Sequence, residues 1–342
     1  MPGDLDDFVT GLPKAEVHLH LEGCIPPDLA ARAAAGTGSR APVPTEEGRP
    51  RIESLGALLS YLDWSCAVVG QPGEVEEIVY STARRLAAAG AAHGDVIFNP
   101  THWPAWRRRL GDMVAALEAG ARAAEADGLA TLSFCLSLKR QQSAGEAAEL
   151  VDFLLAHRSA RLVALSIDGN ESAGSRTEVF VEAFSRAAAA GLRRTAHAGE
   201  SSGPTGVREA IDRLGAERID HGIRCVEEPS LVAELAERKI PLGICPTSNV
   251  RLGLAPSLAE HPVEVLRRAG VAVSLNTDDP ELYGITIAGE YEACAREFAW
   301  EAAQLGQLAR TSIEAAFCGE DRRRELLGLL DGYLAGEART WS

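Results

Sequence analysis

Hydrophobic and polar residues alternate in the stretch EVHLHLEG, residues 16–23. A period of two predicts a β-strand, because successive side chains of a strand point to opposite faces. His18 and His20 therefore lie on one face, one pleat apart. Two neutral imidazoles aimed at the same point suit a divalent metal, most often zinc. The alternative is a half-buried strand with hydrogen-bonded histidines, but burying Glu22 on that face as well is costly without a partner.

From residue 94 onwards a unit of one short apolar strand followed by one helix is repeated along the chain. Near-continuous apolar runs are typical of parallel strands buried on both faces. Eight strands, each followed by helix, predict an α/β fold, a single (β/α)8 TIM barrel that takes up residues 1–342 as one domain. The expected strands span 16–23, 94–100, 130–138, 161–171, 192–200, 216–222, 239–249 and 271–280. The expected helices between them span 106–127, 145–157, 177–190, 205–214, 229–238 and 262–269.

Extra helices are expected between the first two strands and at the C-terminus. Their ranges are 26–35, 54–70, 74–90 and 286–333. Residues 36–52 are rich in Gly, Pro and Thr, which predicts an exposed loop. The helix that follows carries Leu58, Leu62 and Trp64, which would either pack in the core or form a hydrophobic lid over a pocket. On the second interpretation, residues 36–70 are a loop and helical lid inserted into the barrel.

The composition narrows the class of partner. The net charge of −15 disfavours nucleic-acid backbones and anionic membranes, because both bind a basic surface. A small-molecule ligand is expected instead, and the sequence does not indicate an oligomeric state. No apolar run approaches the roughly 20 residues of a membrane span, and the acidic N-terminus lacks the apolar core of a signal peptide. Seven cysteines without a CxxC motif are expected to be reduced core thiols in a cytoplasmic protein.

Polar residues gather where the predicted strands end. His197 and Glu200 lie in HAGE, His221 in DHG, and Asp278 and Asp279 in NTDDP. Each has an ordinary explanation alone, such as a helix cap or a turn. The C-terminal ends of barrel strands meet at one mouth, where TIM barrels keep their chemistry. We therefore expect these side chains to form one site together with the first strand.

Three imidazoles and one carboxylate would form a mononuclear zinc site with room for a water molecule. Zinc lowers the pKa of bound water to about 7, so hydroxide becomes available at neutral pH. The nitrogen ligands would be His18, His20 and His197, and the oxygen ligand would be Asp278 or Asp279.

Proton transfer needs further groups near the metal. Glu200 is a candidate proton shuttle, because it follows His197 by three residues. His221 is a second candidate, either as a general base or to stabilise developing charge. The aspartate of the 278–279 pair that does not bind metal could hydrogen-bond the metal-bound water.

The motifs PKAEVHLHLEG, HAGE, RIDHG and SLNTDDP occur in this order, and they resemble the adenosine/adenine deaminase family of metal-dependent hydrolases. The resemblance covers about residues 12–291 and implies a barrel with one zinc ion per chain. It implies that Glu200 protonates the ring nitrogen next to the attacked carbon, and that His221 and Asp279 position and deprotonate the attacking water. The implied metal ligands are His18, His20, His197 and Asp278. The implied substrate contacts are Glu22, Gly169, Asp279 and His20, with the N–H of Gly169 facing N3 of the purine.

The substrate expected from this resemblance is a 6-aminopurine nucleoside, adenosine or deoxyadenosine, converted to inosine or deoxyinosine with release of ammonia. Gly169 and the apolar 54–70 segment favour a nucleoside. Two departures favour a modified adenosine such as 6-aminodeoxyfutalosine, or free adenine. The adenosine branch has Asp where Glu22 stands, and the second strand here ends in IFNPTHWP.

Other function classes fit less well. Binuclear amidohydrolases often use a bridging lysine, and only Lys139 lies near a strand end, so another mononuclear amidohydrolase is the more remote alternative. A non-catalytic binding protein would normally have lost a ligand or the acid. Zinc deaminases of the His-x-Glu type need a CxxC motif that this chain lacks.

Overall fold

The centre of this computed structural model is a sheet of eight parallel strands, in the order β1-β4-β5-β6-β7-β8-β9-β10. The structure describes residues 5–46, 49–51, 55–171 and 176–340. The strands are β1 (Lys14–His20), β4 (Ala91–Phe98), β5 (Thr131–Lys139), β6 (Leu162–Asp168), β7 (Arg193–Ala198), β8 (Arg218–His221), β9 (Leu242–Ile244) and β10 (Val273–Leu275). The predicted TIM barrel is confirmed.

The barrel closes where the segment after β10 meets β1. The backbone N–H of His20 donates to the carbonyl of Asp278 at 2.9 Å, and the N–H of Asp278 donates to the carbonyl of His18 at 3.3 Å. Asn276 Oδ1 accepts the N–H groups of Val17 and His18, at 2.8 and 3.1 Å. These contacts, which we call the seam, set Asp278 beside the two histidines of β1.

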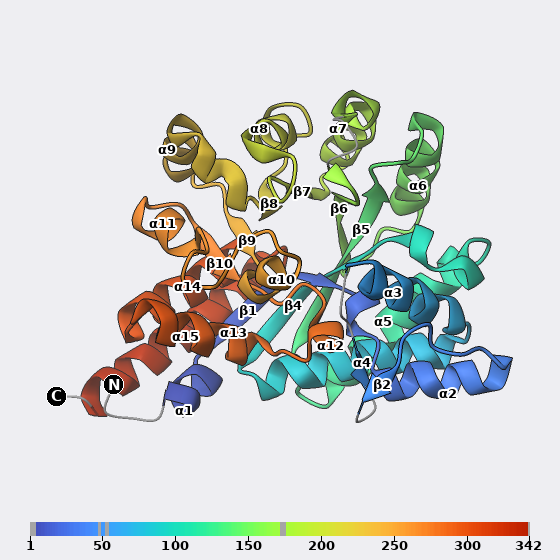
Figure 1. Cartoon of the computed structure of the whole chain (residues 1–342), viewed down its shortest axis with the longest axis horizontal. Coiled ribbons are helices and arrows are strands. Elements are labelled where there is room, and N and C mark those ends of the chain that lie inside the picture. Colours follow the sequence, from blue (N-terminus) through green and yellow to red (C-terminus); the bar gives the residue numbers. More distant parts are fainter. Residues whose placement is uncertain (1–4, 47–48, 52–54, 172–175, 341–342) are drawn as a thin grey trace.

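Helices cover the outside of the barrel, and Figure 1 shows α6 to α9 in a row outside β5 to β8. The helices that follow the strands are α4 (Pro72–Ala88), α5 (Leu110–Ala126), α6 (Ala144–Ala156), α7 (Val181–Ala189), α8 (Gly203–Asp212), α9 (Pro229–Arg238) and α11 (Val263–Arg268). The C-terminal region forms α13 (Ile287–Phe298), α14 (Ala302–Ala315) and α15 (Glu320–Thr340), as the expected run of helices. The N-terminal helices are α1 (Leu5–Gly11), which the sequence did not predict, and α2 (Pro27–Thr37).

Charged residues fill part of the barrel interior below the mouth. Arg218 is fully buried, and its guanidinium donates to Asp95 at 2.7 Å. The same carboxylate accepts the backbone N–H of Phe317 at 2.9 Å, and the guanidinium lies 4.0 Å from the Phe317 ring. Buried charges are tolerated when they are paired in this way. Arg218 and Thr195 also approach the carboxylate of Asp220, at 3.5 and 2.8 Å, which fixes that side chain under the mouth.

Several predicted boundaries are wrong, and the strand expected at 271–280 is only β10. The strand expected at 239–249 is only β9, because Pro246 begins the helix α10 (Pro246–Arg251), where proline loses no hydrogen bond. The loop expected at 36–52 contains a small antiparallel pair, β2 (Thr45–Glu46) and β3 (Arg49–Pro50), while residues 47, 48 and 52 lie outside the described residues.

The helix expected from residue 106 begins later, at α5. Two short 3₁₀-helices come first, η2 (Pro100–His102) and η3 (Pro104–Trp106), each opened by a proline. Between them Trp103 is fully buried. The hydrophobic side chains of this segment therefore line the mouth of the barrel and do not belong to the outer layer of helices.

The expected lid helix is α3 (Leu55–Val68), and its predicted first residue, 54, lies outside the described residues. It packs against η2, η3 and the short helix η1 (Glu22–Cys24) that follows β1. Leu58 and Leu62 are buried, and the half-buried Trp64 donates its indole N–H to Ser39 at 2.9 Å. Both interpretations, core packing and a cover over the mouth, agree with this position, and a moving lid stays a prediction.

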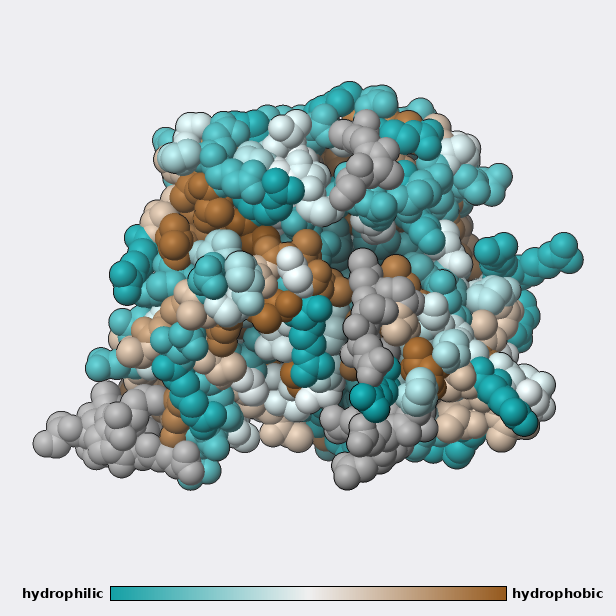
Figure 2. All heavy atoms as spheres, viewed as in Figure 1, coloured by the Kyte–Doolittle hydropathy of each residue, from teal (hydrophilic) through white to brown (hydrophobic). Residues whose placement is uncertain are grey.

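The surface adds little to the search for a site. Figure 2 shows a mainly hydrophilic face with a hydrophobic area over the region of α9 to α11, where Val265 is 61% exposed. Single exposed hydrophobic side chains are ordinary on globular proteins. None of the described helices combines the length and the apolar character needed to cross a bilayer. All seven cysteines are free and buried, as predicted for core thiols.

Candidate active site

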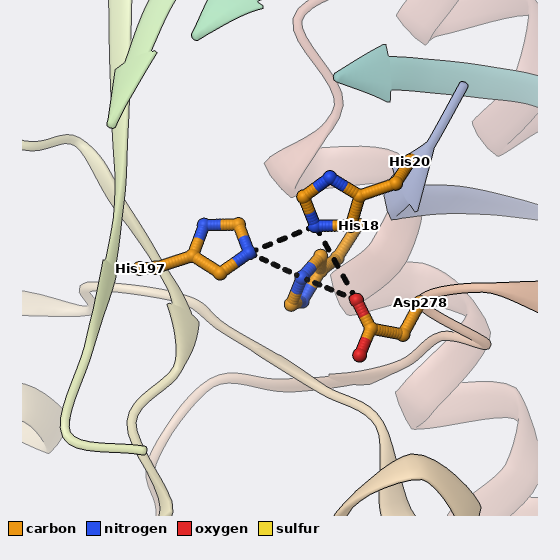
Figure 3. Close-up of side chains that lie close together, drawn as sticks. All are labelled: His18, His20, His197 and Asp278. Atoms are coloured by element: carbon orange, nitrogen blue, oxygen red, sulfur yellow. Dashed lines mark hydrogen bonds and ion pairs between the residues drawn. The ribbon is translucent and has the colours of Figure 1, made fainter. Parts of the chain in front are cut away.

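Four side chains converge at the mouth of the barrel, from β1, from β7 and from the segment after β10 (Figure 3). Nε2 of His197 lies 3.1 Å from Nε2 of His18 and 2.9 Å from Nε2 of His20. Oδ1 of Asp278 lies 3.4 and 3.3 Å from the same atoms of His18 and His20. The ligand atoms all lie within 4.8 Å of one another. The structure thus brings together the four residues expected to bind metal.

The outer nitrogens of two rings face oxygen acceptors, and this decides what the inner nitrogens offer. Nδ1 of His18 lies 2.8 Å from the carbonyl oxygen of Gly243, so Nδ1 carries the hydrogen. Nδ1 of His197 faces Oδ2 of Asp220 at 3.4 Å. When both rings are neutral, each presents a lone pair on Nε2 to its neighbour, which is repulsive unless a proton or a metal cation lies between them. Three imidazole nitrogens and one carboxylate, oriented by outer partners, fit a zinc ion.

Electrostatics at this cluster favour a cation. Burial alone would lower the pKa of His197, but the carboxylates of Asp220, Asp168 and Asp278 outweigh it and raise the pKa to about 9. Burial and the neighbouring His197 lower the pKa of His20 to about 4. The three carboxylates near His197 therefore favour a positive charge at this point.

A second group of possible ligands comprises His18, His221 and Cys245. It is less suited to a metal, because Nδ1 of His18 already donates to Gly243. Burial also raises the pKa of the Cys245 thiol well above its ordinary value, so the thiolate that binds metal is disfavoured.

Two site residues have strained backbones. Among the described non-glycine residues, φ is positive at His221, Asp278, Lys239 and Ala299. Lys239 and Ala299 end helices, where this conformation is common. His221 (φ 68°) and Asp278 (φ 64°) end no helix, and such strain persists where surrounding contacts impose it, often at functional sites. For Asp278 these contacts include the seam and the hydroxyl of Ser248, 2.7 Å from Oδ2.

Glu200 has the properties of a general acid. Burial, with the nearby carboxylates of Asp278 and Glu171, raises its pKa to about 8, so it is largely protonated at neutral pH. Its backbone is fixed by Glu171, whose Oε2 accepts the N–H groups of residues 200, 201 and 202 at 3.1, 3.0 and 2.8 Å. Glu171 was not predicted as a site residue, although it ends the SIDGNE stretch.

His221 and Asp279 lie beside the cluster. Nε2 of His221 is 3.5 Å from Oε1 of Glu200, and its ring centroid is 4.4 Å from that of His18. Burial and the charge of Asp278 raise the pKa of Asp279 well above its usual range. The ordinary explanation for Asp279, a cap on the helix α12 (Pro280–Tyr283), does not hold, because its side chain makes no capping hydrogen bond.

A family profile described as "Adenosine deaminase" matches residues 13–333. The chain belongs to the adenosine deaminase family. It is 34% identical to an adenine deaminase of Streptomyces coelicolor, across 96% of this chain and 97% of that protein. It is 35% identical to an aminodeoxyfutalosine deaminase of the same organism, across 98% of this chain and 88% of that protein.

Solved structures agree with this membership of the adenosine deaminase family. An adenine deaminase from Arthrobacter aurescens superposes with a TM-score of 0.87 at 30% identity, covering 95% of this chain and 99% of that one. An amidohydrolase from Burkholderia ambifaria with bound Zn gives 0.88 at 29% identity, covering 99% of this chain and 95% of that one. A bound zinc in a related structure agrees with the donor set described above.

The rim of the deaminase site is built around Glu22. Its Oε1 accepts the backbone N–H of Asn99 at 2.8 Å and the indole N–H of Trp103 at 2.7 Å. The amide of Asn99 donates to Asp168 at 2.5 Å. Oε2 of Glu22 is buried and has no hydrogen-bond partner among the residues that the structure describes. Asn99 and Trp103 were not predicted as site residues, although their unusual strand ending, IFNPTHWP, was the signal that could have found them.

Gly169 follows Asp168 at this rim, with φ of 91°. A side chain there would be strained, and a Cβ would meet the side-chain amide of Gln141 at 2.9 Å. Glycine is therefore required for the backbone. The contact of its N–H with a purine N3 stays a prediction of the family resemblance.

Gly23 makes room for Asp279, because a Cβ at Gly23 would overlap the Cα and side chain of Asp279. We expect Gly23→Ala to lower both kcat/KM and the melting temperature, since overpacking typically costs about 1–3 kcal/mol. The matched control is Gly73→Ala in α4, where a Cβ meets nothing within 4 Å. Ammonia release and thermal unfolding test both variants, and unchanged activity in Gly23→Ala would show that Asp279 can shift without loss.

Proposed function

We propose that this chain is a zinc-dependent deaminase of a 6-aminopurine, with free adenine as its substrate. Water adds its oxygen at C6, the C6–N bond breaks, and hypoxanthine and ammonia are released. Membership of the family supports the reaction class. The relatives named adenine deaminase and aminodeoxyfutalosine deaminase favour the alternatives over the adenosine or deoxyadenosine expected first.

The observation that supports free adenine is the unpartnered Oε2 of Glu22. Free adenine carries an N–H on its five-membered ring, whereas a nucleoside carries a sugar there. Glu22 is fixed by Trp103 and Asn99, so its second oxygen is a preorganised acceptor beside the mouth. A site built to accept a substrate N–H discriminates strongly against an analogue that lacks it, because the buried group is then left unpaired.

Each proposed catalytic step uses a residue at the mouth. A zinc ion held by His18, His20, His197 and Asp278 would supply a polarised water at neutral pH. Glu200, protonated at this pH, gives its proton to the ring nitrogen next to C6 and makes that carbon electrophilic. Asp279 takes the proton of the attacking water, because its Oδ1 is buried and has no hydrogen-bond partner among the described residues. His221 lies between Glu200 and the cluster and contacts the reacting oxygen.

The second candidate substrate is a modified adenosine of the aminodeoxyfutalosine type. It is supported by the relative of that name, which is 35% identical over 98% of this chain. The same acid, base and metal ligands serve both reactions. The two candidates differ only in what occupies the space beside Glu22 and α3.

A substrate panel tests the proposal. We expect kcat/KM for adenine to exceed that for adenosine and deoxyadenosine by roughly 100-fold or more, since a buried acceptor is left unpaired by a nucleoside. Glu22→Gln should lower kcat/KM for adenine selectively, because the Gln oxygen keeps the Trp103 contact while its NH₂ cannot accept a substrate N–H. Turnover of aminodeoxyfutalosine but not adenine would establish the second candidate. Efficient turnover of adenosine would restore the nucleoside expectation.

The remaining parts of the proposal are one zinc ion per chain, a small purine as the ligand, and a cytoplasmic location. The net charge of −15 supports a partner other than nucleic acid or an anionic membrane. The seven free, buried cysteines support a reducing compartment.

A further inference from the structure

A line of hydrogen bonds leads from the first turn of α11 to His221. The backbone N–H of Val263 donates to Nδ1 of His261 at 3.1 Å. Nε2 of His261 lies 3.1 Å from Oδ1 of Asn249. Nδ2 of Asn249 lies 3.3 Å from Nδ1 of His221. The three side chains are at most 2% exposed, so water does not compete for these contacts.

The direction of this line is fixed at its outer end. A backbone N–H can only donate, so Nδ1 of His261 carries no hydrogen and its Nε2 carries one. That hydrogen points at Asn249 and identifies the facing amide atom as the oxygen. The amide nitrogen of Asn249 therefore faces His221, and it can only donate. Nδ1 of His221 must accept, whatever the charge on the rest of the ring.

We propose that Asn249 and His261 are positioning residues that hold His221 in the tautomer with its hydrogen on Nε2. In this form His221 donates a hydrogen bond to the reacting oxygen and does not take the proton of the attacking water. The inference rests on the proposed deamination site.

The surroundings of Nε2 agree with a donor there. Nε2 lies 3.5 Å from Oε1 of Glu200, and a carboxyl oxygen can accept. The strained backbone of His221 keeps the ring in this place, since φ is 68° at that residue. A donor aimed at an oxygen that gains negative charge stabilises the transition state, and removing one such donor typically costs about 10²–10³-fold in kcat.

Asn249→Asp tests the tautomer directly, because an ionised carboxylate offers only acceptors and has the same shape as the amide. We expect the hydrogen of His221 to move to Nδ1 and kcat to fall about 10²–10³-fold. The tautomer is read from the ¹⁵N shifts of the imidazole rings in the zinc-loaded protein, which has eight histidines. Assignment of the His221 signals comes from His221→Gln. Zinc content and melting temperature should stay close to wild type.

His261 supplies the matched pair of variants. His261→Gln keeps an N–H that can donate to Asn249 Oδ1, so it should retain the Nε2–H form of His221 and most of kcat. His261→Leu removes the donor and frees the Asn249 amide to rotate, so it should lower kcat and give mixed His221 signals. A purely structural role would lower the melting temperature in both variants and leave the tautomer unchanged.

The outcomes separate this inference from the proposed function. A hydrogen on Nδ1 of His221 in the wild-type protein overturns the inference, even if adenine is deaminated normally. The inference is also overturned if the Asn249→Asp variant keeps the tautomer and the turnover of the wild-type protein. A protein with the expected tautomer that releases no ammonia from any 6-aminopurine contradicts the proposed function instead.

Discussion

Glu200→Gln is expected to remove most of the turnover while the metal stays bound. A polarised water alone does not make C6 electrophilic, because the ring nitrogen must also gain a proton. General acid catalysis of this kind contributes about 10²–10⁴-fold, so kcat should fall by that factor. Glutamine keeps the shape of the side chain, and Glu200 is not among the four converging ligand residues. Ammonia release and metal analysis on the same sample check both parts.

The pH dependence of wild-type activity provides a second test of Glu200. A general acid works only while it is protonated, and burial with two nearby carboxylates raises the pKa of Glu200 to about 8. Activity should therefore fall as the pH rises through about 8, and Glu200→Gln should lose that limb of the profile. The exposed Glu237→Gln in α9 is the control and should match wild type. A near-normal rate in Glu200→Gln would remove Glu200 from the mechanism.

His18→Ala is expected to lose metal and activity together. His18 is fully buried, and its Nδ1 contact with Gly243 fixes the ring so that Nε2 faces His197 and Asp278. Removing this ring deletes one of four ligands and the orientation it imposes. We expect bound zinc to fall from about one ion per chain to near zero, with turnover at background, as metal analysis and ammonia release would show.

Asp278→Ala should behave like His18→Ala, because it removes the oxygen ligand from the same point. The control is His157→Ala, an exposed histidine at the end of α6, which should keep both metal and activity. Two tightly held ions in the wild-type protein would favour the binuclear amidohydrolase alternative. A His18→Ala variant that keeps one ion and normal turnover would place the metal elsewhere.

The sequence predicted the barrel and three of the metal-facing residues because both depend on local periodicity. Alternation in β1 sets His18 and His20 on one face, and parallel strands bring their C-terminal ends to one mouth. His197 follows from the same geometry, which leaves the oxygen ligand open between Asp278 and Asp279. The family resemblance selects Asp278. Glu200 and His221 were candidates for proton transfer from their positions at strand ends, and the family resemblance gave them and Asp279 specific roles. The structure places these residues at that mouth.

The residues that orient the site could not be predicted in this way. Ser248 and Asn249 lie in α10, within a stretch that was expected to be strand, and His261 lies before α11 without any periodic signal. Glu171 acts through three backbone N–H groups, and no sequence pattern records such contacts. The rim around Trp103 depends on two 3₁₀-helices, which residue periodicity does not reveal.

The seam determines at which stage of synthesis and folding the site can form. The contact between His18 and Asn276 joins positions 258 residues apart, so nearly the whole chain must be synthesised before β1 finds its last partner. Closing so long a loop is entropically unfavourable until many contacts form together. A bound metal would tie the two ends of the barrel to each other as a cross-link, and the ligands for it exist only in the finished fold. Deaminase activity would therefore require a chain that extends beyond β10. A product truncated before β10 would keep the three histidine ligands and lack the carboxylate of Asp278.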